Sequence, residues 1–510
     1  ISNDEIAENL EISDQSIINE NIEEEIVLEE IVEKNSFWEN LDSSELKNYF
    51  INLQNINSKL LQVEFYNFLE NSNLDYEIKN NRDIFFQIIN YFYNTGNISK
   101  SYNLLKLRNI SNDENISFYY SIEINYLLST FQLDEVCILR NEVSENIFVK
   151  NFLLDKIDIF CLVLQNKLTE AELLNSILLE TENEIDVNFQ NLYQKLILVG
   201  NENNYEKISF EKKLNKDLIF LYSAMARIAE LPLTEDFLEI DPKNLAIPII
   251  LNQASSVDLR IMAANESFNN KNISVESLAA LYQSVDFNSN QLNNPDQTIK
   301  ELEDNIELLI AFYFQQINIQ IFPSDRLNAL INFWEFAKEN NLEEIAYSLS
   351  YKITQSIEIS ADNLEYSPQI STSYIYNNDF EKALDWISFY ENSKQEDEKS
   401  LFIKILLNLY SSEDINSLVS IIIENFDKFS SSNSIENEEL IFILLDILNK
   451  NDKKELSVNY ENVFDERLIP NIYILDNIRN SIEDNDDNKF LIYSIISINN
   501  KQWLEIHPDH

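Results

Sequence analysis

The sequence has very few glycines and histidines for a chain of 510 residues. Gly96 and Gly200 are its only glycines, and His507 and His510 are its only histidines. Two separated glycines cannot form the clustered glycine loops that hold phosphates in P-loop and dinucleotide-binding enzymes. A histidine-dependent triad or a zinc site would have to be built from the last four residues, because residues 1–506 contain no histidine. We therefore expect no cofactor, no metal ion and no catalytic residues.

Basic residues are also scarce. The chain has 37 Lys and Arg against 88 Asp and Glu, a formal net charge of -51. Such a chain lacks the cationic surface that grips nucleic acid, and it is a poor partner for anionic membranes. Its apolar runs are much shorter than the ~18 residues of a membrane-spanning helix, so we expect no direct membrane insertion. The acidity has two explanations that stay open: adaptation to a salty environment, or a cationic partner or divalent cations.

Apolar residues recur at the three- and four-residue steps of an α-helix, as at Phe333, Phe336 and Ala337. Alternating strand patterns are rare, and so are the Asn-Gly and Asp-Gly turns of β-hairpins. Helices joined by Asn, Asp and Ser turns need little glycine, because Asn tolerates the left-handed conformation that ends a helix. The sequence predicts an all-α protein.

A short motif of polar turn residues and an apolar anchor recurs along the chain, with a small or apolar residue three positions after the anchor. It occurs as GNISKSYNLL from Gly96, FQLDEVCIL from Phe131, NKLTEAELL from Asn166, NNYEKISF from Asn203, NNDFEKALDWI from Asn377 and SEDINSLVSI from Ser412. The anchors are Ile98, Leu133, Leu168, Tyr205, Phe380 and Ile415, spaced by 35, 35 and 37 residues in the first group and by 35 in the second. A period of this length is typical of stacked helical hairpins.

The repeated motif resembles the second helix of a tetratricopeptide repeat, most closely at Asn377–Ile387. The first helix departs from that family, because its Trp-x-x-Leu-Gly-x-x-Tyr signature is missing, so a HEAT-like or irregular array stays open. Two segments, Asp258–Val285 and Ile159–Glu180, also resemble an uncharacterised group of exported helical-repeat proteins of alphaproteobacteria. That resemblance implies a cleaved signal sequence outside the printed chain and a periplasmic location; the cytoplasm is the alternative. It implies no known activity.

The predicted fold is an α-solenoid in four segments. Residues 1–35 are an acidic, disordered tether, and residues 36–220 are an N-terminal repeat arm. In residues 221–325 the 35-residue interval is lost and Pro and Ala become frequent, which predicts an irregular helical middle segment with short helices. Residues 326–510 are a C-terminal repeat arm.

Four residues are candidates for a special role. Cys137 and Cys161 lie in helices that should pack together in a solenoid, so they form either a disulfide or two buried free thiols. Arg227 and Arg260 stand out in a segment poor in basic residues. Each either pairs with an acid or contacts an anionic ligand or a partner.

Stacked helical hairpins commonly bind proteins or peptides on their extended surface. We therefore expect a non-enzymatic interaction scaffold or adaptor in the bacterial cell envelope. Its partners are proteins or peptides, and its acidic surface would favour cationic ones. One alternative is a carboxylate-dependent hydrolase of envelope polysaccharide, which requires two carboxylates facing each other in a pocket. The other is a structural spacer. The sequence does not indicate the oligomeric state.

Overall fold

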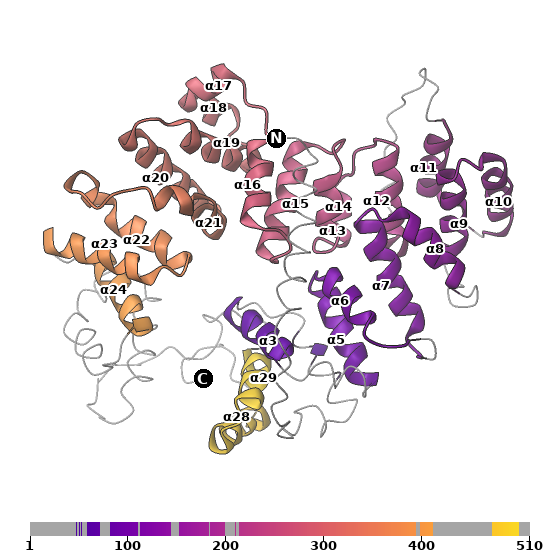
Figure 1. Ribbon diagram of the computed structural model, residues 1–510, viewed down its shortest axis with the longest axis horizontal. Helices are drawn as coiled ribbons and strands as arrows, with labels where there is room; N and C mark the ends of the chain where they lie inside the picture. Colours follow the sequence, from indigo (N-terminus) through magenta and orange to yellow (C-terminus); the bar gives the residue numbers. More distant parts are fainter. Residues whose placement is uncertain are drawn as a thin grey trace, which may run out of the picture. The chain divides into compact units, whose positions relative to one another are not determined.

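The computed structural model describes residues 59–71, 82–110, 113–143, 152–182, 184–198, 210, 214–393, 398–411 and 472–498, together with positions 47, 50, 51 and 53 (Figure 1). These residues form 23 α-helices and two short 3-10 helices, and none of them lies in a strand. The all-α prediction is confirmed. The predicted tether, residues 1–35, lies outside the described residues.

The chain divides into two compact units. Unit 1 comprises Ile1–Asn55 and Val63–Ala311, and unit 2 comprises Ile56–Gln62 and Phe312–His510. The boundary at Ala311 falls within α19 and within the predicted middle segment, 221–325. The division into two arms and a middle segment stays a prediction.

The helices up to the unit boundary are α3 (Lys59–Asn71), α5 (Arg82–Asn94), α6 (Ile98–Leu105), α7 (Ile116–Ser129), α8 (Leu133–Glu142), α9 (Leu153–Leu164), α10 (Leu168–Thr181), α11 (Val187–Leu198), η3 (Lys216–Leu218), α12 (Ile219–Ile228), α13 (Glu235–Ile240), α14 (Ala246–Leu251), α15 (Val257–Asn269), α16 (Val275–Gln283), α17 (Ser289–Asn293), α18 (Pro295–Glu301) and α19 (Ile306–Ile319). Those after it are α20 (Pro323–Glu339), α21 (Glu343–Thr354), η4 (Ala361–Tyr366), α22 (Ser367–Tyr376), α23 (Phe380–Ser393), α24 (Glu398–Ser411), α28 (Ile472–Asp484) and α29 (Asp487–Ile498). The short helices α13, α14, α17 and α18 all lie within residues 221–325, where the frequent prolines predict short helices.

Eight turns between helices share one geometry. In each, a residue with positive φ ends the helix, and the next residue donates its backbone N–H to the carbonyl five positions earlier, as Lys167 donates to Leu162 at 2.9 Å. This is the Schellman arrangement, which satisfies carbonyls that a helix end leaves unpaired. The left-handed residues are Gly96, Phe131, Asn166, Glu230, Lys271, Asn341, Asn378 and Asn485. Asn fills half of these positions, so the expectation that Asn replaces glycine here holds.

The repeated motif corresponds to a repeated helix start. The four anchors among the described residues are each the first residue of a helix: Ile98, Leu133, Leu168 and Phe380. The residue three positions later is fully buried in every case, namely Ser101, Val136, Ala171 and Ala383, each 0% exposed. Anchors Tyr205 and Ile415 lie outside the described residues. The motif therefore marks where a helix starts and which side of its first turn packs inward, while the tetratricopeptide assignment stays a prediction.

Unit 1 also contains packing between segments far apart in sequence. Helix α12 packs on α7 as well as on its neighbour α11 (Figure 1). The turn before α6 contacts two later turns of the same unit, one before α14 and one after α15. Asn244 Nδ2 donates to Tyr93 O and Asn272 Nδ2 donates to Gly96 O, both at 2.9 Å. In a simple solenoid each repeat contacts only its sequence neighbours. These contacts are an additional feature of unit 1 that the repeat pattern does not contain.

Candidate interaction surface

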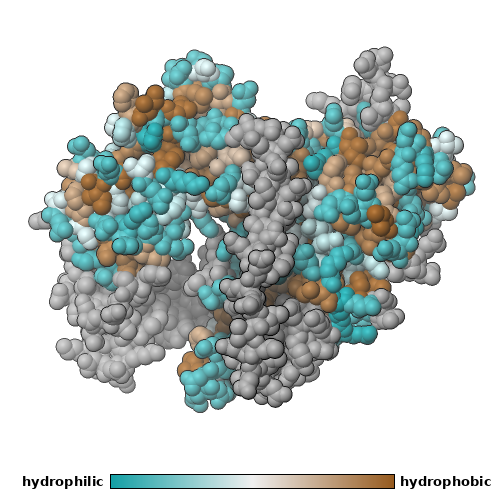
Figure 2. Space-filling model, viewed as in Figure 1, coloured by the Kyte–Doolittle hydropathy of each residue, from teal (hydrophilic) through white to brown (hydrophobic). Residues whose placement is uncertain are grey.

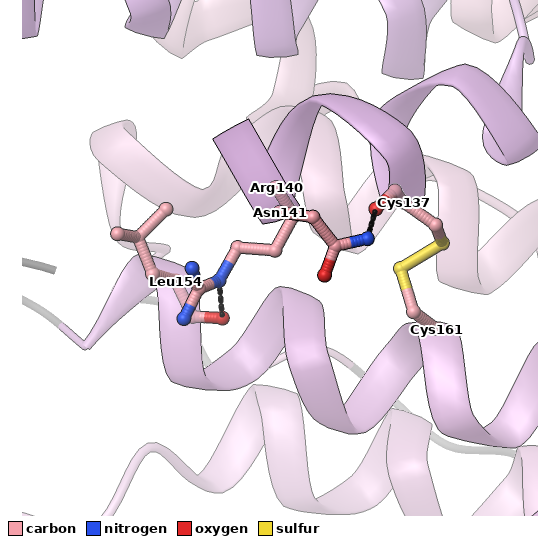
Figure 3. The surroundings of a disulfide bond; sticks show 5 residues. All are labelled: Cys137, Arg140, Asn141, Leu154 and Cys161. Carbon is pink, nitrogen blue, oxygen red and sulfur yellow. Dashed lines mark hydrogen bonds between the residues drawn. A yellow bond between two sulfur atoms is a disulfide. The ribbon is translucent and has the colours of Figure 1, made fainter. Parts of the chain in front are cut away.

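A disulfide joins α8 to α9. Cys137 on α8 and Cys161 on α9 are bonded, with 5.7 Å between their Cα atoms (Figure 3). Of the two alternatives that the sequence leaves open, the structure has the bridge. Helix α8 buries only Val136 and Leu139. Because so little apolar surface holds α8, the covalent link is a substantial part of its attachment.

Arg140, three residues after Cys137, also attaches α8 to α9. Its Nη2 donates to Asp158 Oδ2 at 2.6 Å, and its Nε donates to the carbonyl of Leu154 at 3.4 Å, the contact drawn in Figure 3. Its side chain is 13% exposed and that of Asp158 is 33% exposed, so water only partly screens the ion pair. Helix α8 is therefore fixed on α9 by a covalent bond and by a charged hydrogen bond, which lie within one turn of each other on α8.

A buried charged cluster fixes the opposite side of α9. Lys156 Nζ donates to Glu182 Oε1 and to Asp186 Oδ2, each at 2.8 Å, and the lysine side chain is only 1% exposed. Tyr222 OH on α12 donates to the same Asp186 oxygen at 2.7 Å. Lys156 also lies over the ring of Phe189, with Nζ 5.6 Å from its centroid. We call Lys156, Glu182, Asp186 and Tyr222 the Lys156 cluster.

The Lys156 cluster joins four helices. Lys156 lies on α9, Glu182 caps the end of α10, and Tyr222 lies on α12. Asp186 precedes α11, and its Oδ1 accepts the backbone N–H of Phe189. Burial, followed by the nearby Asp186 carboxylate, raises the pKa of Tyr222, so its hydroxyl stays protonated and donates. Because both carboxylates bind one buried ammonium, the arrangement is that of a structural ion-pair network and differs from two carboxylates facing a substrate.

Helix α10 has one face in the core and one apolar face in solvent. Its buried residues are Ala171, Asn175 and Leu178. On other sides of the helix, Leu173 is 62% exposed and Ile177 is 47% exposed, and Leu174 beside them is also exposed. Hydrophobic side chains are visible at the right-hand edge of Figure 2, where Figure 1 places α10. We call Leu173, Leu174 and Ile177 the α10 outer face.

More exposed apolar side chains occur in the same stretch of chain. Among the described residues from α8 to the start of α11, the exposed large apolar residues are Ile138, Leu168, Leu173, Leu174, Ile177, Leu179, Ile185 and Val187. Single exposed apolar residues are normal on a protein surface, whereas several on one helix mark a site of interaction. These eight residues are the candidate interaction surface.

Arg227 and Arg260 are each half-buried, and neither forms an ion pair with a described residue. Arg227 lies over the ring of Phe131, 4.1 Å from its centroid, and Arg260 Nε donates to the carbonyl of Ile250 at 2.9 Å. Burial lowers the pKa of both guanidinium groups from their usual value. In the described part of the chain these arginines pack against a ring and a carbonyl, so the expected pairing with an acid is not seen there. A contact with an anion or a partner stays a prediction.

No protein-family model, curated protein or solved structure matches this chain. The resemblance to tetratricopeptide proteins therefore rests on the repeated residues alone, and the resemblance to exported alphaproteobacterial proteins rests on the segments Asp258–Val285 and Ile159–Glu180 alone. No described helix combines the length and the apolar character needed to cross a membrane. Within the same residues, no three His, Cys, Asp or Glu side chains are grouped so that they could hold a metal ion. His507 and His510 lie outside the described part.

The sequence interpretation missed both the Lys156 cluster and the α10 outer face. Lys156 had a readable signal, because it falls on the face of Leu153, Ile157 and Phe160, which is otherwise apolar and buried. A lysine at a core position of a helix requires a carboxylate partner. In α10, apolar residues occur on more sides than one packing face needs, which is the pattern of a helix with a second contact.

Proposed function

We propose that this protein is a non-enzymatic scaffold or adaptor that binds other proteins or peptides on a helical-repeat framework of the tetratricopeptide-like solenoid kind. The observation that carries the proposal is the set of exposed apolar side chains among the described residues between Ile138 and Val187. They lie on or beside helices fixed by the Cys137–Cys161 disulfide and the Lys156 cluster. Exposed apolar surface on rigid elements is the usual basis of protein recognition. The regular Schellman turns and the 35-residue interval support the repeat framework.

We propose the periplasm as the site of action. The Cys137–Cys161 disulfide supports this location, because disulfides persist in oxidising compartments and are rare in the bacterial cytoplasm. A scaffold in that compartment would meet other exported proteins. The acidic charge of the chain, -51, favours the approach of cationic partners.

The test is chemical crosslinking of the full-length protein in its native cells, with fractionation of the cells and identification of captured proteins by mass spectrometry. We expect a defined set of envelope proteins from the periplasmic fraction. Capture of none, at crosslinker concentrations that trap known complexes in the same cells, would refute the scaffold. Recovery of the protein itself in the cytoplasmic fraction, with both cysteines reduced, would refute the location.

A further inference from the structure

We infer that the α10 outer face is the docking site for a cationic amphipathic helix of a partner protein. This inference rests on the proposed function and specifies where the partner binds and what it looks like. Three observations support it: the placement of the apolar residues, the charges on the same helix, and the absence, in the described residues, of a strand edge that could bind an extended segment.

The apolar residues form a ridge along α10. Leu173 and Ile177 are four residues apart and Leu174 and Ile177 are three apart, so the three side chains are neighbours on the helix surface. The buried residues Ala171 and Leu178 lie on another side, which packs on α9. A ridge of this spacing fits the groove between the corresponding rows of a second helix. The α10 outer face therefore has the geometry of an unfilled helix–helix contact.

The charged residues within α10 are all acidic. Glu170, Glu172 and Glu180 are exposed on α10, and the helix carries no basic residue. A partner helix with Lys or Arg flanking its apolar stripe would bring opposite charges together at the rim, which speeds encounter and fixes orientation. A second copy of this chain would bring the same glutamates against each other, on a molecule with a net charge of -51. The charges therefore favour a cationic partner over self-association.

A helix also fits better than an extended strand. Binding of an extended segment to a sheet requires an exposed strand edge, and the described residues contain no strand. In helix recognition, apolar residues at i, i+3, i+4 and i+7 of the partner insert along an apolar surface such as this one.

The probe for a test is a peptide of about 18 residues, five helical turns, made of Leu and Lys with the Leu residues on one face and a photo-crosslinker on that face. One control peptide replaces Lys with Glu, and a second scrambles the sequence so that no apolar face forms. The full-length protein is compared with the Leu173→Gln/Ile177→Gln double variant. Ile321→Gln is the matched control, because Ile321 is 82% exposed and lies outside unit 1.

We expect the Lys peptide to bind, its crosslinks to map to Leu168–Thr181, and the double variant to weaken binding by at least about tenfold, with Ile321→Gln unchanged. Circular dichroism of each variant checks that the helices are intact. Equal binding of the scrambled or the Glu peptide, crosslinks elsewhere, or an affinity unchanged in the double variant would overturn the inference. So would self-association of the wild type that the double variant abolishes, because the occupant would then be a second copy.

The two proposals fail in different ways. If crosslinking in cells captures defined partners but neither the peptide nor those partners depend on Leu173 and Ile177, the α10 assignment is wrong and the scaffold remains. If the peptide binds at α10 but no partner is captured in cells, the scaffold function is wrong while the chemistry of the site holds.

Discussion

Replacing Lys156 with Met should strongly destabilise the part of unit 1 built around α9. Methionine keeps most of the apolar stem, but it removes the ammonium that binds Glu182 Oε1 and Asp186 Oδ2, each at 2.8 Å. The two carboxylates are then left together, with side chains only 8% and 11% exposed. Removing one partner of a buried ion pair typically costs about 3–5 kcal/mol. We expect a loss of this size in the free energy of opening of α9 to α12.

Native-state hydrogen exchange of the amides in these helices is the suitable assay, because two compact units need not unfold together and one global transition would average them. The reference is the same change in a Glu182→Gln/Asp186→Asn background. There Met replaces a buried ammonium that has already lost both of these carboxylates, so the change should cost less than about 1 kcal/mol or should stabilise the protein. Lys167→Met, at an exposed lysine, controls for loss of a positive charge. A cost for Lys156→Met below about 1 kcal/mol, or an equal cost in both backgrounds, would refute the assignment of Lys156 as the charge that balances this cluster.

Three further perturbations test the turns and the buried tyrosines. Gly96→Ala should destabilise unit 1 by about 2 kcal/mol or more, because Gly96 has φ 91° and an added Cβ would lie 2.5 Å from Lys243 Cβ; an unchanged thermal midpoint would contradict this close approach. Lys271→Gly should stabilise the protein by about 0.5–1 kcal/mol in urea unfolding, because it relieves an exposed left-handed residue with φ 59°, and a loss of stability would show that the lysine side chain contributes more than the strain costs. Burial, and then Asp241, raises the pKa of Tyr93 to about 12, and burial also raises that of Tyr222. Since these folded-state pKa values lie above the unfolded value of 10.0, the stability that they contribute is intact below pH 10 and falls from there toward pH 12; a urea midpoint that rises over this interval would contradict the assignment.

The features that the sequence predicts correctly are local ones. The all-α class follows from periodicity, and the repeated anchor that the sequence shows coincides with the helix starts at Leu133, Leu168 and Phe380. Each depends on residues within one turn of the helix, where spacing alone decides which side packs inward. The disulfide partners Cys137 and Cys161 could be named as a candidate pair because they fall on adjacent helices.

The features that the sequence interpretation missed depend on distant partners. Lys156 binds residues 26 and 30 positions away, at the end of one helix and before the next, and no short-range pattern specifies which acids fold back to it. The ring partner of Arg227 is Phe131, on a turn almost a hundred residues earlier. Apolar residues on several sides of α10 indicate a second contact, but they do not show that Leu173 is exposed, because an apolar residue on a helix is buried or exposed according to what packs over it.

The attachments that fix α9 also limit the movement of α10, and this should affect how tightly a partner binds there. On one side α9 is bonded to α8 through Cys161, and on the other Lys156 ties it to the end of α10 and to the start of α11. Helix α10 packs mainly on α9, so both attachments limit how far the α10 outer face can move. A binding surface that is already rigid loses little conformational entropy when a partner docks, and more of the apolar contact energy then appears as affinity. Reduction of the disulfide should therefore weaken helix binding at α10 even though neither cysteine lies on that helix, and the same peptide titration measured before and after reduction would detect the change.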